Sequence, residues 1–285
     1  MEKIIFDCDN TMGVRTKEID DGLALFYLLG RPDVSLVGVT TTFGNGTIDQ
    51  VYPQTQKMVT DLGRQDIPVI KGAGKRLEEP TGAARFLADK AAACPGEITI
   101  LATGPLGNLR GATELDPNFY SNLKAIVCMG GYLHPIKVGR RDVKELNLSA
   151  DPEASFDVLN APCPVTLMNA QICLQAPFRW RDYWKLDFWS RKTRWMVRDW
   201  LVLHAVFCGI PNFYLWDLLP AVYVTHPGLF YDYGVMIQST VNDLEDGTLL
   251  PEDSVGGRGV NMPVLINDLD RFIEILFEAW RRIFV

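Results

Sequence analysis

Two pairs of aspartates stand near the beginning of the chain. Asp7 and Asp9 follow a short apolar run, and Asp20 and Asp21 open an apolar segment with helical spacing. Carboxylates that lie close together repel one another unless a cation is present or some of them are protonated. An all-oxygen set favours Ca²⁺ or Mg²⁺ over zinc, and one carboxylate of such a site can take a proton from water. The alternative is structural: Asp7 bonds loop amides and Asp20 caps a helix.

Further polar side chains occur later in the chain. Asp217 follows Trp216 at the start of an apolar helical run, where it can also serve as a helix N-cap. Glu145 and Asn147 precede a second helix start at Asp151. Carboxylates and amides suit a polyhydroxylated ligand because each can accept hydrogen bonds from hydroxyl groups or donate to them.

The elements that must position these residues alternate between strands and helices. We expect short apolar strands at 3–6, 34–41, 67–70, 98–101 and 125–128, and helices at 20–29, 48–62 and 83–93 and from near residue 105. Apolar strands joined by helices indicate a parallel sheet that is covered on both faces. The carboxyl ends of such strands meet at one edge, which is the usual ligand crevice. We therefore predict an α/β fold in one large domain, residues 1–285, with a mostly parallel, Rossmann-like sheet.

Several short motifs follow one another in a characteristic order. They are Asp7-x-Asp9, Asp20-Asp21, Gly38-Val-Thr-Thr-Thr-Phe-Gly-Asn45, Ala102-Thr-Gly-Pro-Leu-Gly-Asn108, Val127-Cys-Met129-Gly-Gly, Glu145-Leu-Asn147, Asp151-Pro-Glu-Ala and Trp216-Asp217. From about residue 3 to residue 225, this order resembles that of the inosine–uridine nucleoside hydrolase superfamily. The resemblance implies the nucleoside hydrolase fold and an enzyme that hydrolyses the N-glycosidic bond of ribonucleosides to free base and ribose.

The resemblance also implies a role for each matching residue. Asp9 would contact a bound Ca²⁺ and deprotonate the attacking water. Asp21 and Asp217 would be the other carboxylate ligands, and Thr103 would bind the ion through its backbone carbonyl. The implied ribose-binding set is Asp20, Asn45, Met129, Glu145 and Asn147. Members of this superfamily are commonly dimers or tetramers, so a homodimer or homotetramer is expected.

The chain departs from the family pattern in the loop between the aspartate pairs. Ten residues, Asn10–Ile19, stand where the family usually has a compact Asp-Pro-Gly-x-Asp-Asp loop. This insertion would place Asn10, Arg15 or Lys17 near the mouth of the pocket, where the 5′ end of a substrate would lie.

A second departure concerns the leaving base. Trp216 stands where many pyrimidine-handling or broad-specificity members carry a histidine that protonates the base. Tryptophan has no titratable proton, but it can stack on a purine, as in the purine-preferring branch, so we expect a preference for purine nucleosides and a role in purine salvage. The alternative is a core tryptophan. None of the three histidines, His134, His204 and His226, falls on a family histidine position, and only His134 lies near a strand-end loop.

Composition limits the remaining possibilities. The 285 residues are 47% hydrophobic and 22% charged, which allows a sizeable core, and the net charge is −7. An acidic chain of this kind argues against nucleic-acid and anionic-membrane partners. No run of about 18 apolar residues occurs, and the start is unlike a signal peptide. The six cysteines show no C-x-x-C and no metal-finger spacing, so we expect reduced, buried thiols. We expect a cytoplasmic protein that acts on a small-molecule nucleoside.

Two other functions remain open at this point. The motif Phe6-Asp7-Cys-Asp9-Asn-Thr11 also resembles the first motif of haloacid-dehalogenase phosphatases, in which Asp7 would accept a phosphoryl group with Mg²⁺ as the ion. Those enzymes also need a later lysine and a late acidic motif at strand ends, and neither is evident. The second alternative is a nucleoside-binding protein without turnover, because the loop is altered and the family histidine is missing.

Three later segments also have distinctive compositions. The segment 179–200 combines basic residues with five tryptophans, Trp180, Trp184, Trp189, Trp195 and Trp200. We interpret it as an amphipathic cover on the core or on a partner subunit, although basic and aromatic residues together can also bind nucleic acids. We expect Gly256-Gly-Arg-Gly259 to be a loop, and Asp268–Val285 to be a packing helix.

Overall fold

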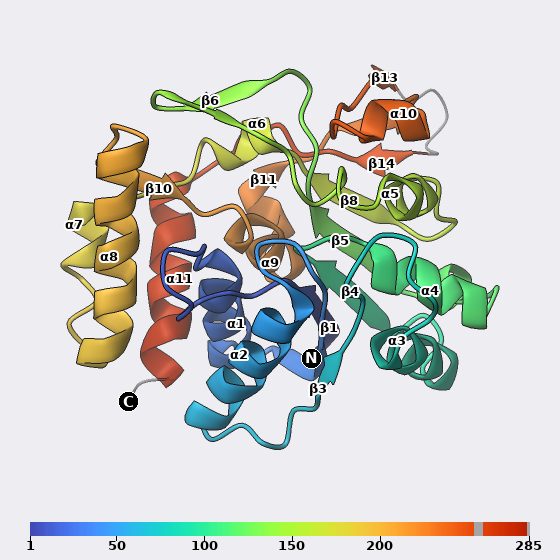
Figure 1. Cartoon of the computed structure of the whole chain (residues 1–285), viewed down its shortest axis with the longest axis horizontal. Coiled ribbons are helices and arrows are strands. Elements are labelled where there is room, and N and C mark those ends of the chain that lie inside the picture. The colour runs from blue at the N-terminus through green and yellow to red at the C-terminus, as the bar shows by residue number, and fades with distance from the viewer. Residues whose placement is uncertain (254–258, 284–285) are drawn as a thin grey trace.

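A nine-stranded sheet runs through the centre of the molecule in the order β13-β12-β14-β8-β5-β4-β1-β2-β3 (Figure 1). The computed structural model describes residues 1–253 and 259–283. Neighbouring strands from β3 to β14 are parallel, whereas β12 pairs antiparallel with both β14 and β13. The strands of this sheet are β1 (Glu2–Cys8), β2 (Val34–Thr41), β3 (Val69–Lys71), β4 (Ile98–Ala102), β5 (Ala125–Met129), β8 (Val165–Met168), β12 (Gly234–Ile237), β13 (Pro251–Asp253) and β14 (Val260–Asn261).

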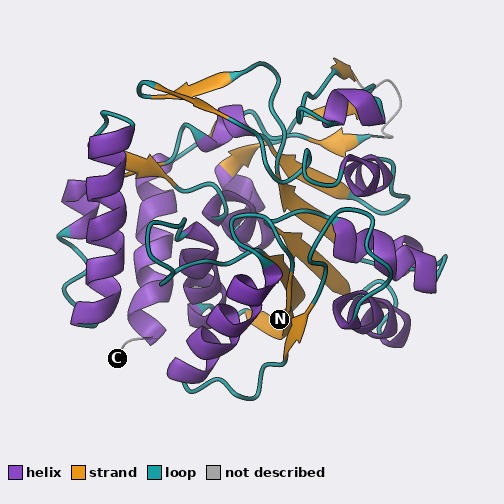
Figure 2. Cartoon of the chain, viewed as in Figure 1, coloured by secondary structure: helices purple, strands orange, loops and turns teal. Residues whose placement is uncertain are grey.

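Helices cover both faces of the sheet (Figure 2). In Figure 1, α3, α4 and α5 lie to the right of the sheet, and α1 and α11 lie to its left. The helices are α1 (Asp20–Gly30), α2 (Ile48–Asp61), α3 (Gly82–Ala93), α4 (Gly107–Leu115), α5 (Pro152–Leu159), α6 (Ala170–Cys173), α7 (Trp180–Tyr183), α8 (Arg191–Phe207), α9 (Leu218–Thr225), α10 (Val241–Leu244) and α11 (Leu269–Ile283). The predicted α/β fold with a mostly parallel sheet is confirmed.

The strand β1 shows why the sheet is covered on both sides. Ile4 and Phe6 point into one hydrophobic core, while Ile5 between them points into the other. Successive side chains of a strand face opposite sides, so a strand without polar alternation must be buried twice. The two cores therefore follow directly from the continuous apolar runs of the central strands.

Short antiparallel pairs lie outside the main sheet. The hairpin of β6 (Ile136–Val138) and β7 (Arg141–Val143) follows the end of β5. The other pairs join β9 (Pro177–Arg179) to β10 (Asn212–Tyr214), and β11 (Phe230–Tyr231) to β15 (Leu265–Ile266). Two 3₁₀ turns complete the described elements, η1 (Tyr120–Asn122) and η2 (Pro227–Leu229).

The tryptophan-rich segment forms part of the helical cover, as predicted. Trp189 is buried, with its ring centroid 5.5 Å from that of Phe26 and 5.2 Å from that of Trp280. Trp184 and Trp195 are exposed at 66% and 45%, so only part of the segment packs on the core. Within residues 1–253 and 259–283, no helix combines the length and apolar character needed to cross a membrane.

The C-terminal predictions have different outcomes. The packing helix is confirmed as α11, whose buried side includes Phe272, Leu276 and Trp280. The expected loop Gly256-Gly-Arg-Gly259 lies largely outside the described residues, because 254–258 are not among them.

Candidate active site

The predicted site residues meet because neighbouring parallel strands end at the same edge of the sheet. Asp7 near the end of β1 pairs with Thr40 of β2 on one side and with Ala102 of β4 on the other. The segments that follow these strands therefore begin side by side. They carry Asp9 after β1 and Thr103 after β4, while β5 ends at Met129.

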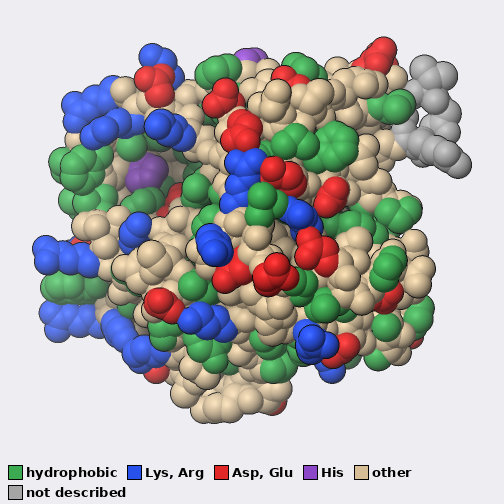
Figure 3. Space-filling model, turned by 45° about the vertical axis from the view of Figure 1, so that its right-hand side comes forward, with side chains coloured by type: hydrophobic (Ala, Val, Ile, Leu, Met, Phe, Trp, Pro, Cys, Tyr) green, Lys and Arg blue, Asp and Glu red, His purple; other side chains and the backbone are tan. Residues whose placement is uncertain are grey.

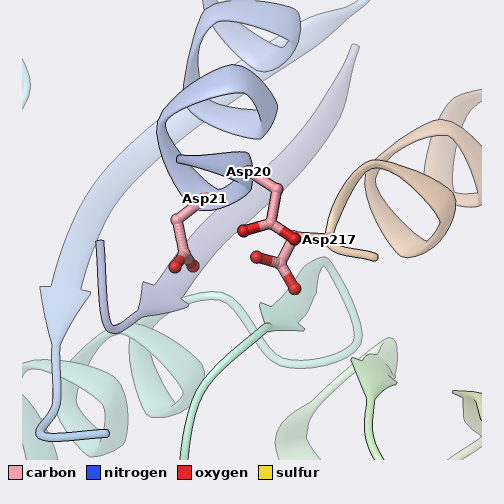
Figure 4. A group of neighbouring side chains, drawn as sticks. All are labelled: Asp20, Asp21 and Asp217. Carbon is pink, nitrogen blue, oxygen red and sulfur yellow. The ribbon is translucent and has the colours of Figure 1, made fainter. Parts of the chain in front are cut away.

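Three buried carboxylates from two helix starts face one another (Figure 4). Asp20 and Asp21 open α1, and Asp217 directly precedes α9. One carboxylate oxygen of each lies within 4.8 Å of the others. Asp217 occupies the N-cap position of α9, but its side chain makes no capping hydrogen bond. Helix capping therefore does not explain why an aspartate stands at position 217.

The electrostatics of this cluster suit a hard divalent cation. Burial, followed by the charge of Asp21, raises the pKa of Asp20 to about 7, and burial raises the pKa values of Asp21 and Asp217 well above their ordinary value. Three carboxylates in one buried space cannot all ionise without a compensating positive charge. Oδ1 of Asp20 is buried and has no hydrogen-bond partner among the described residues. The cluster can therefore hold a metal ion through oxygen ligands.

The composition of this cluster differs from the predicted ligand set. The prediction assigned Asp9, Asp21, Thr103 and Asp217 to the metal and Asp20 to the ribose, whereas the mutually close carboxylates are Asp20, Asp21 and Asp217. Asp20 and Asp21 are adjacent in the first turn of α1, and Figure 4 shows the carboxylate of Asp20 next to Asp217 with Asp21 to one side. Asp9 lies beside this group, in contact with the carboxyl of Asp21.

Asp9 is held by the loop after β2. Its carboxylate accepts hydrogen bonds from the backbone N–H of Asn45 and, at 3.3 Å, from Nδ2 of Asn45. Gly44 has φ +148°, and a Cβ there would collide with Oδ2 of Asp9, so glycine is required at this position. Burial raises the pKa of Asp9 to about 7. A carboxylate with such a pKa can accept a proton near neutral pH.

Asp7 connects the strand ends beneath the site. Its Oδ1 accepts hydrogen bonds from Oγ1 of Thr40 and, at 2.8 Å, from Nδ2 of Asn108. Asn108 also donates to the carbonyl of Thr41, so the ends of β1 and β2 are tied to α4. The structural alternative for Asp7 was hydrogen bonding to loop amides. Its carboxylate instead accepts hydrogen bonds from these two side chains. Neither Asp7 nor its partners line the pocket described next.

A pocket of about 200 Å³ opens above the carboxylates. All six predicted substrate-binding residues line it: Asp20, Asn45, Met129, Glu145, Asn147 and Trp216. Thr103 and Asp217 line it as well, whereas Asp9 and Asp21 are not among its lining residues. Figure 3 shows a hollow in the surface with a histidine inside and basic side chains along its rim. One pocket therefore contains groups that suit a polyhydroxylated ligand next to the candidate metal site.

Glu145 and Asn147 are held rigidly by the loops around them. Glu145 accepts backbone N–H bonds from Gly131 at 3.0 Å and from Ser149 at 2.7 Å. Nδ2 of Asn147 donates to the carbonyls of Thr103 at 2.9 Å and Met129 at 3.0 Å. The hydroxyl of Thr103 donates to Oδ1 of Asp21 at 2.7 Å. This network links the ends of β4 and β5 to the carboxylate cluster.

The chain is similar in sequence to known enzymes. A family model described as inosine-uridine preferring nucleoside hydrolase matches residues 4–273. The chain belongs to this family. Uridine nucleosidase 1 of Arabidopsis thaliana is 28% identical over 91% of this chain and 85% of its own length. A pyrimidine-specific ribonucleoside hydrolase of Shewanella woodyi is 28% identical over 97% of both chains.

Solved structures of nucleoside hydrolases share the fold. A plant nucleoside hydrolase superposes with a TM-score of 0.85 at 23% identity, covering 98% of this chain and 99% of its own. A purine-preferring ribonucleoside hydrolase from Gardnerella vaginalis also gives 0.85 at 20% identity, covering 99% of both chains. The protein is thus an enzyme of the nucleoside hydrolase family, which cleaves N-glycosidic bonds.

The insertion of this hydrolase folds against the site. Asn10 is buried and donates to Oγ1 of Thr55, so it does not reach the pocket mouth as expected. Nζ of Lys17 donates to the carbonyl of Asn45 at 2.7 Å. Glu18, which the sequence did not single out, lines the pocket next to Asn45. No local pattern marks Glu18, because its place depends on how the whole insertion folds back.

The histidine of the pocket is His204, in the last turns of α8. His134, the only histidine expected near a strand end, is exposed and does not line the pocket. Sequence reasoning missed His204 because α8 lies outside the strand–helix alternation, and no strand end leads to it.

Proposed function

We propose that this hydrolase cleaves ribonucleosides to free base and ribose with a bound Ca²⁺. The buried cluster of Asp20, Asp21 and Asp217 at the bottom of the pocket carries this proposal, because it gathers three oxygen ligands that need a positive charge. Asp9 and the carbonyl of Thr103 complete the expected ligand set. Asp20 lies at the boundary between the ion and the ribose, since it both belongs to the cluster and lines the pocket.

Asp9 is the group that we assign to water activation. Its hydrogen bonds from Asn45 fix its position, and its contact with Asp21 places it next to the ion site. A Ca²⁺ held by these carboxylates would supply positive charge that makes a nearby water more acidic. Asp9 would accept a proton from the attacking water as its oxygen adds to C1′, and nearby carboxylates would stabilise the oxocarbenium-like transition state.

The ribose would be held by the fixed polar groups around the cluster. Asn45 and Asn147 line the pocket with their amide groups, and Glu145 contributes a carboxylate. The hydrogen bonds that hold Glu145 and Asn147 lower the cost of ordering them when a sugar binds. Position and polarity therefore support a role in ribose binding for this set.

Two observations bear on the choice of base. Trp216 lines the pocket and offers a flat aromatic face, with its ring centroid 5.7 Å from that of Tyr214, which favours stacking on a purine. By contrast, the curated relatives described above are named for uridine or for pyrimidines. Comparison of kcat/KM for inosine and uridine decides between a purine and a pyrimidine preference.

We also infer a cytoplasmic homo-oligomer. All six cysteines are free, as expected of a protein in a reducing compartment. The exposed Trp184 and Trp195 support an interface between copies on the α7–α8 side. Sedimentation of the purified protein and of Trp195→Ala tests this inference.

The activity test follows free ribose from inosine, adenosine, uridine and cytidine. Ribose release that stops in Asp9→Ala and after chelation of Ca²⁺ supports the proposed reaction. Nucleoside binding without ribose release would instead support a binding protein. Phosphate release from phosphomonoesters without ribose release would support the phosphatase alternative and overturn the proposal.

A further inference from the structure

The β6–β7 hairpin and the end of α8 supply a second part of the pocket lining, on different elements from the carboxylates. Ile136 and Val138 of β6 line it together with His204 of α8. The guanidinium groups of Arg140 and Arg141 donate to the carbonyl of Phe207 at 3.1 and 3.2 Å, so the hairpin is fastened to the C-terminal end of α8. Apolar and aromatic walls suit a flat base, whereas the carboxylate end suits the sugar. The N-glycosidic bond would therefore lie between the two ends.

His204 is the histidine of this part of the pocket, and an imidazole can exchange a proton near neutral pH. Its ring packs against Trp200 and Phe213, with centroid distances of 5.0 and 6.1 Å. Its Nδ1 is buried and has no hydrogen-bond partner in the part of the chain that the structure describes. A buried polar nitrogen without a partner is costly, which points to a ligand group as its missing partner or to a proton-transfer role for the ring.

We propose that His204 donates a proton to the leaving base. This assignment rests on the proposed ribonucleoside hydrolysis. As the bond between C1′ and the base nitrogen breaks, its electron pair moves to the base, and the imidazolium of His204 gives its proton to a nitrogen or carbonyl oxygen of that base. The hydroxide derived from water adds to C1′, and the proton of the water goes to Asp9. Solvent then returns one proton from Asp9 to His204, so the cycle consumes only nucleoside and water.

This role cannot be filled by the neighbouring aromatic side chain. Trp216 lines the same pocket, but an indole has no titratable proton near neutral pH. Trp216 is therefore suited to hold the base by contact with its ring, and His204 is suited to protonate it. The two residues come from separate elements, the residue before Asp217 and the end of α8.

The surroundings of His204 determine the sign of its pH dependence. Burial lowers the pKa of His204 below its usual 6.5, and the nearby backbone of Asn212 on β10 partly opposes this shift. The titratable and charged groups that share its pocket or its neighbouring strand are Glu18, Asp20, Tyr132, Arg141, Lys144, Glu145, Cys208, Tyr214 and Asp217. Because the protonated ring is the donor, turnover of nucleosides should fall as pH rises through this lowered pKa.

The test compares two kinds of leaving group in His204→Gln. Nucleosides need a proton on the departing base, whereas p-nitrophenyl β-D-ribofuranoside releases a stable phenolate without one. We expect kcat for inosine and uridine to fall by about 100-fold, which is typical for loss of a general acid. The rate with the p-nitrophenyl riboside should stay close to that of the wild type, and the fall of kcat with rising pH should disappear from the nucleoside profile. His134→Gln, at the exposed histidine, is the matched control.

Each other outcome overturns a defined part of the account. Equal losses on both substrates, repeated in His204→Asn with unchanged thermal unfolding, would show a structural role for His204. Unchanged nucleoside turnover in both variants would remove His204 from the reaction while leaving the proposed function intact. If the wild type released no ribose from any nucleoside, the proposed function would fail and the His204 assignment with it.

Discussion

The carboxylate end of the pocket is built from the central sheet, whereas the base end is built from the periphery of the fold. At the first end, Asp20, Asp21 and Asp217 stand at helix starts beside buried strands. At the other end, His204 and Ile136 lie on a helix and a hairpin joined to each other by arginine–carbonyl bonds. The first arrangement has its geometry fixed by the sheet and by the two helices, α1 and α9, that pack on it. The second can vary without disturbing the sheet, so we assign the common chemistry to the first end and base selection to the second.

The largest effect is expected at the carboxylate end, from Asp9→Asn. The amide keeps the shape of the side chain but cannot accept a proton from water. We expect kcat for nucleosides to fall by about 1,000-fold, with a small change in KM. Steady-state ribose release measures the effect, and Asp66→Asn, at an exposed ion pair with Arg64, is the control. A loss smaller than tenfold would contradict the role of Asp9 as the base.

The second effect concerns the backbone that holds Asp9. Gly44→Ala places a Cβ against Oδ2 of Asp9 at a positive φ. We expect a loss of about 1–3 kcal/mol in the free energy of unfolding, together with a lower kcat, because Asp9 must move. Urea denaturation measures the free energy of unfolding, and ribose release measures kcat. Gly228→Ala is the control, since a Cβ there meets nothing within 4 Å, and equal stability of the two variants would contradict the close approach.

At the base end, a smaller effect is expected from Trp216→Ala. Loss of a stacking surface of this kind weakens binding by about tenfold, which should appear mainly in KM. Tyr231→Ala, at an exposed tyrosine of β11, is the control. If the loss is larger for inosine than for uridine, the pocket prefers purines. If kcat falls equally for inosine and uridine while KM stays unchanged, Trp216 does not act on the base.

The smallest effect is a dependence of the metal-free stability on pH. Burial raises the pKa values of Asp7, Asp9 and Asp20 from 3.8 to about 7. Because the folded state binds protons more tightly than the unfolded state, the associated stability is full below about pH 4 and is lost as pH rises through 7. We expect Tm without Ca²⁺ to fall steadily between pH 5 and pH 8. Saturating Ca²⁺ should reduce this fall in Tm. Asp7→Asn should also reduce it, because this variant removes one of the three carboxyls whose pKa is raised.

The same difference between the two ends explains what the sequence could predict. The strands β1, β2, β4 and β5 were found because continuous apolar runs are recognisable locally. Once they were placed in a parallel sheet, Asn45, Thr103 and Met129 had to come together. The roles expected for the residues on the ribose side of the pocket came from the resemblance to nucleoside hydrolases, which the order of the motifs carried.

Other features depended on contacts that no local pattern records. The contact of Asp20 with Asp217 depends on how α1 and α9 pack, and Glu18 enters the pocket only because the insertion folds back on Asn45. The position of His204 depends on the docking of α8 and on the bonds from the hairpin. Strands as short as β14, with two residues, give no periodicity by which they could be recognised.

Calorimetric titration of Ca²⁺ into metal-stripped enzyme, with ribose release followed in the same samples, tests the central claim most directly. The wild type should bind Ca²⁺ and regain nucleoside hydrolysis as the site fills, while Asp217→Asn should bind at least tenfold more weakly and require correspondingly more Ca²⁺ for turnover. Full hydrolysis by the stripped enzyme, or equal Ca²⁺ affinity in the wild type and Asp217→Asn, would contradict the account.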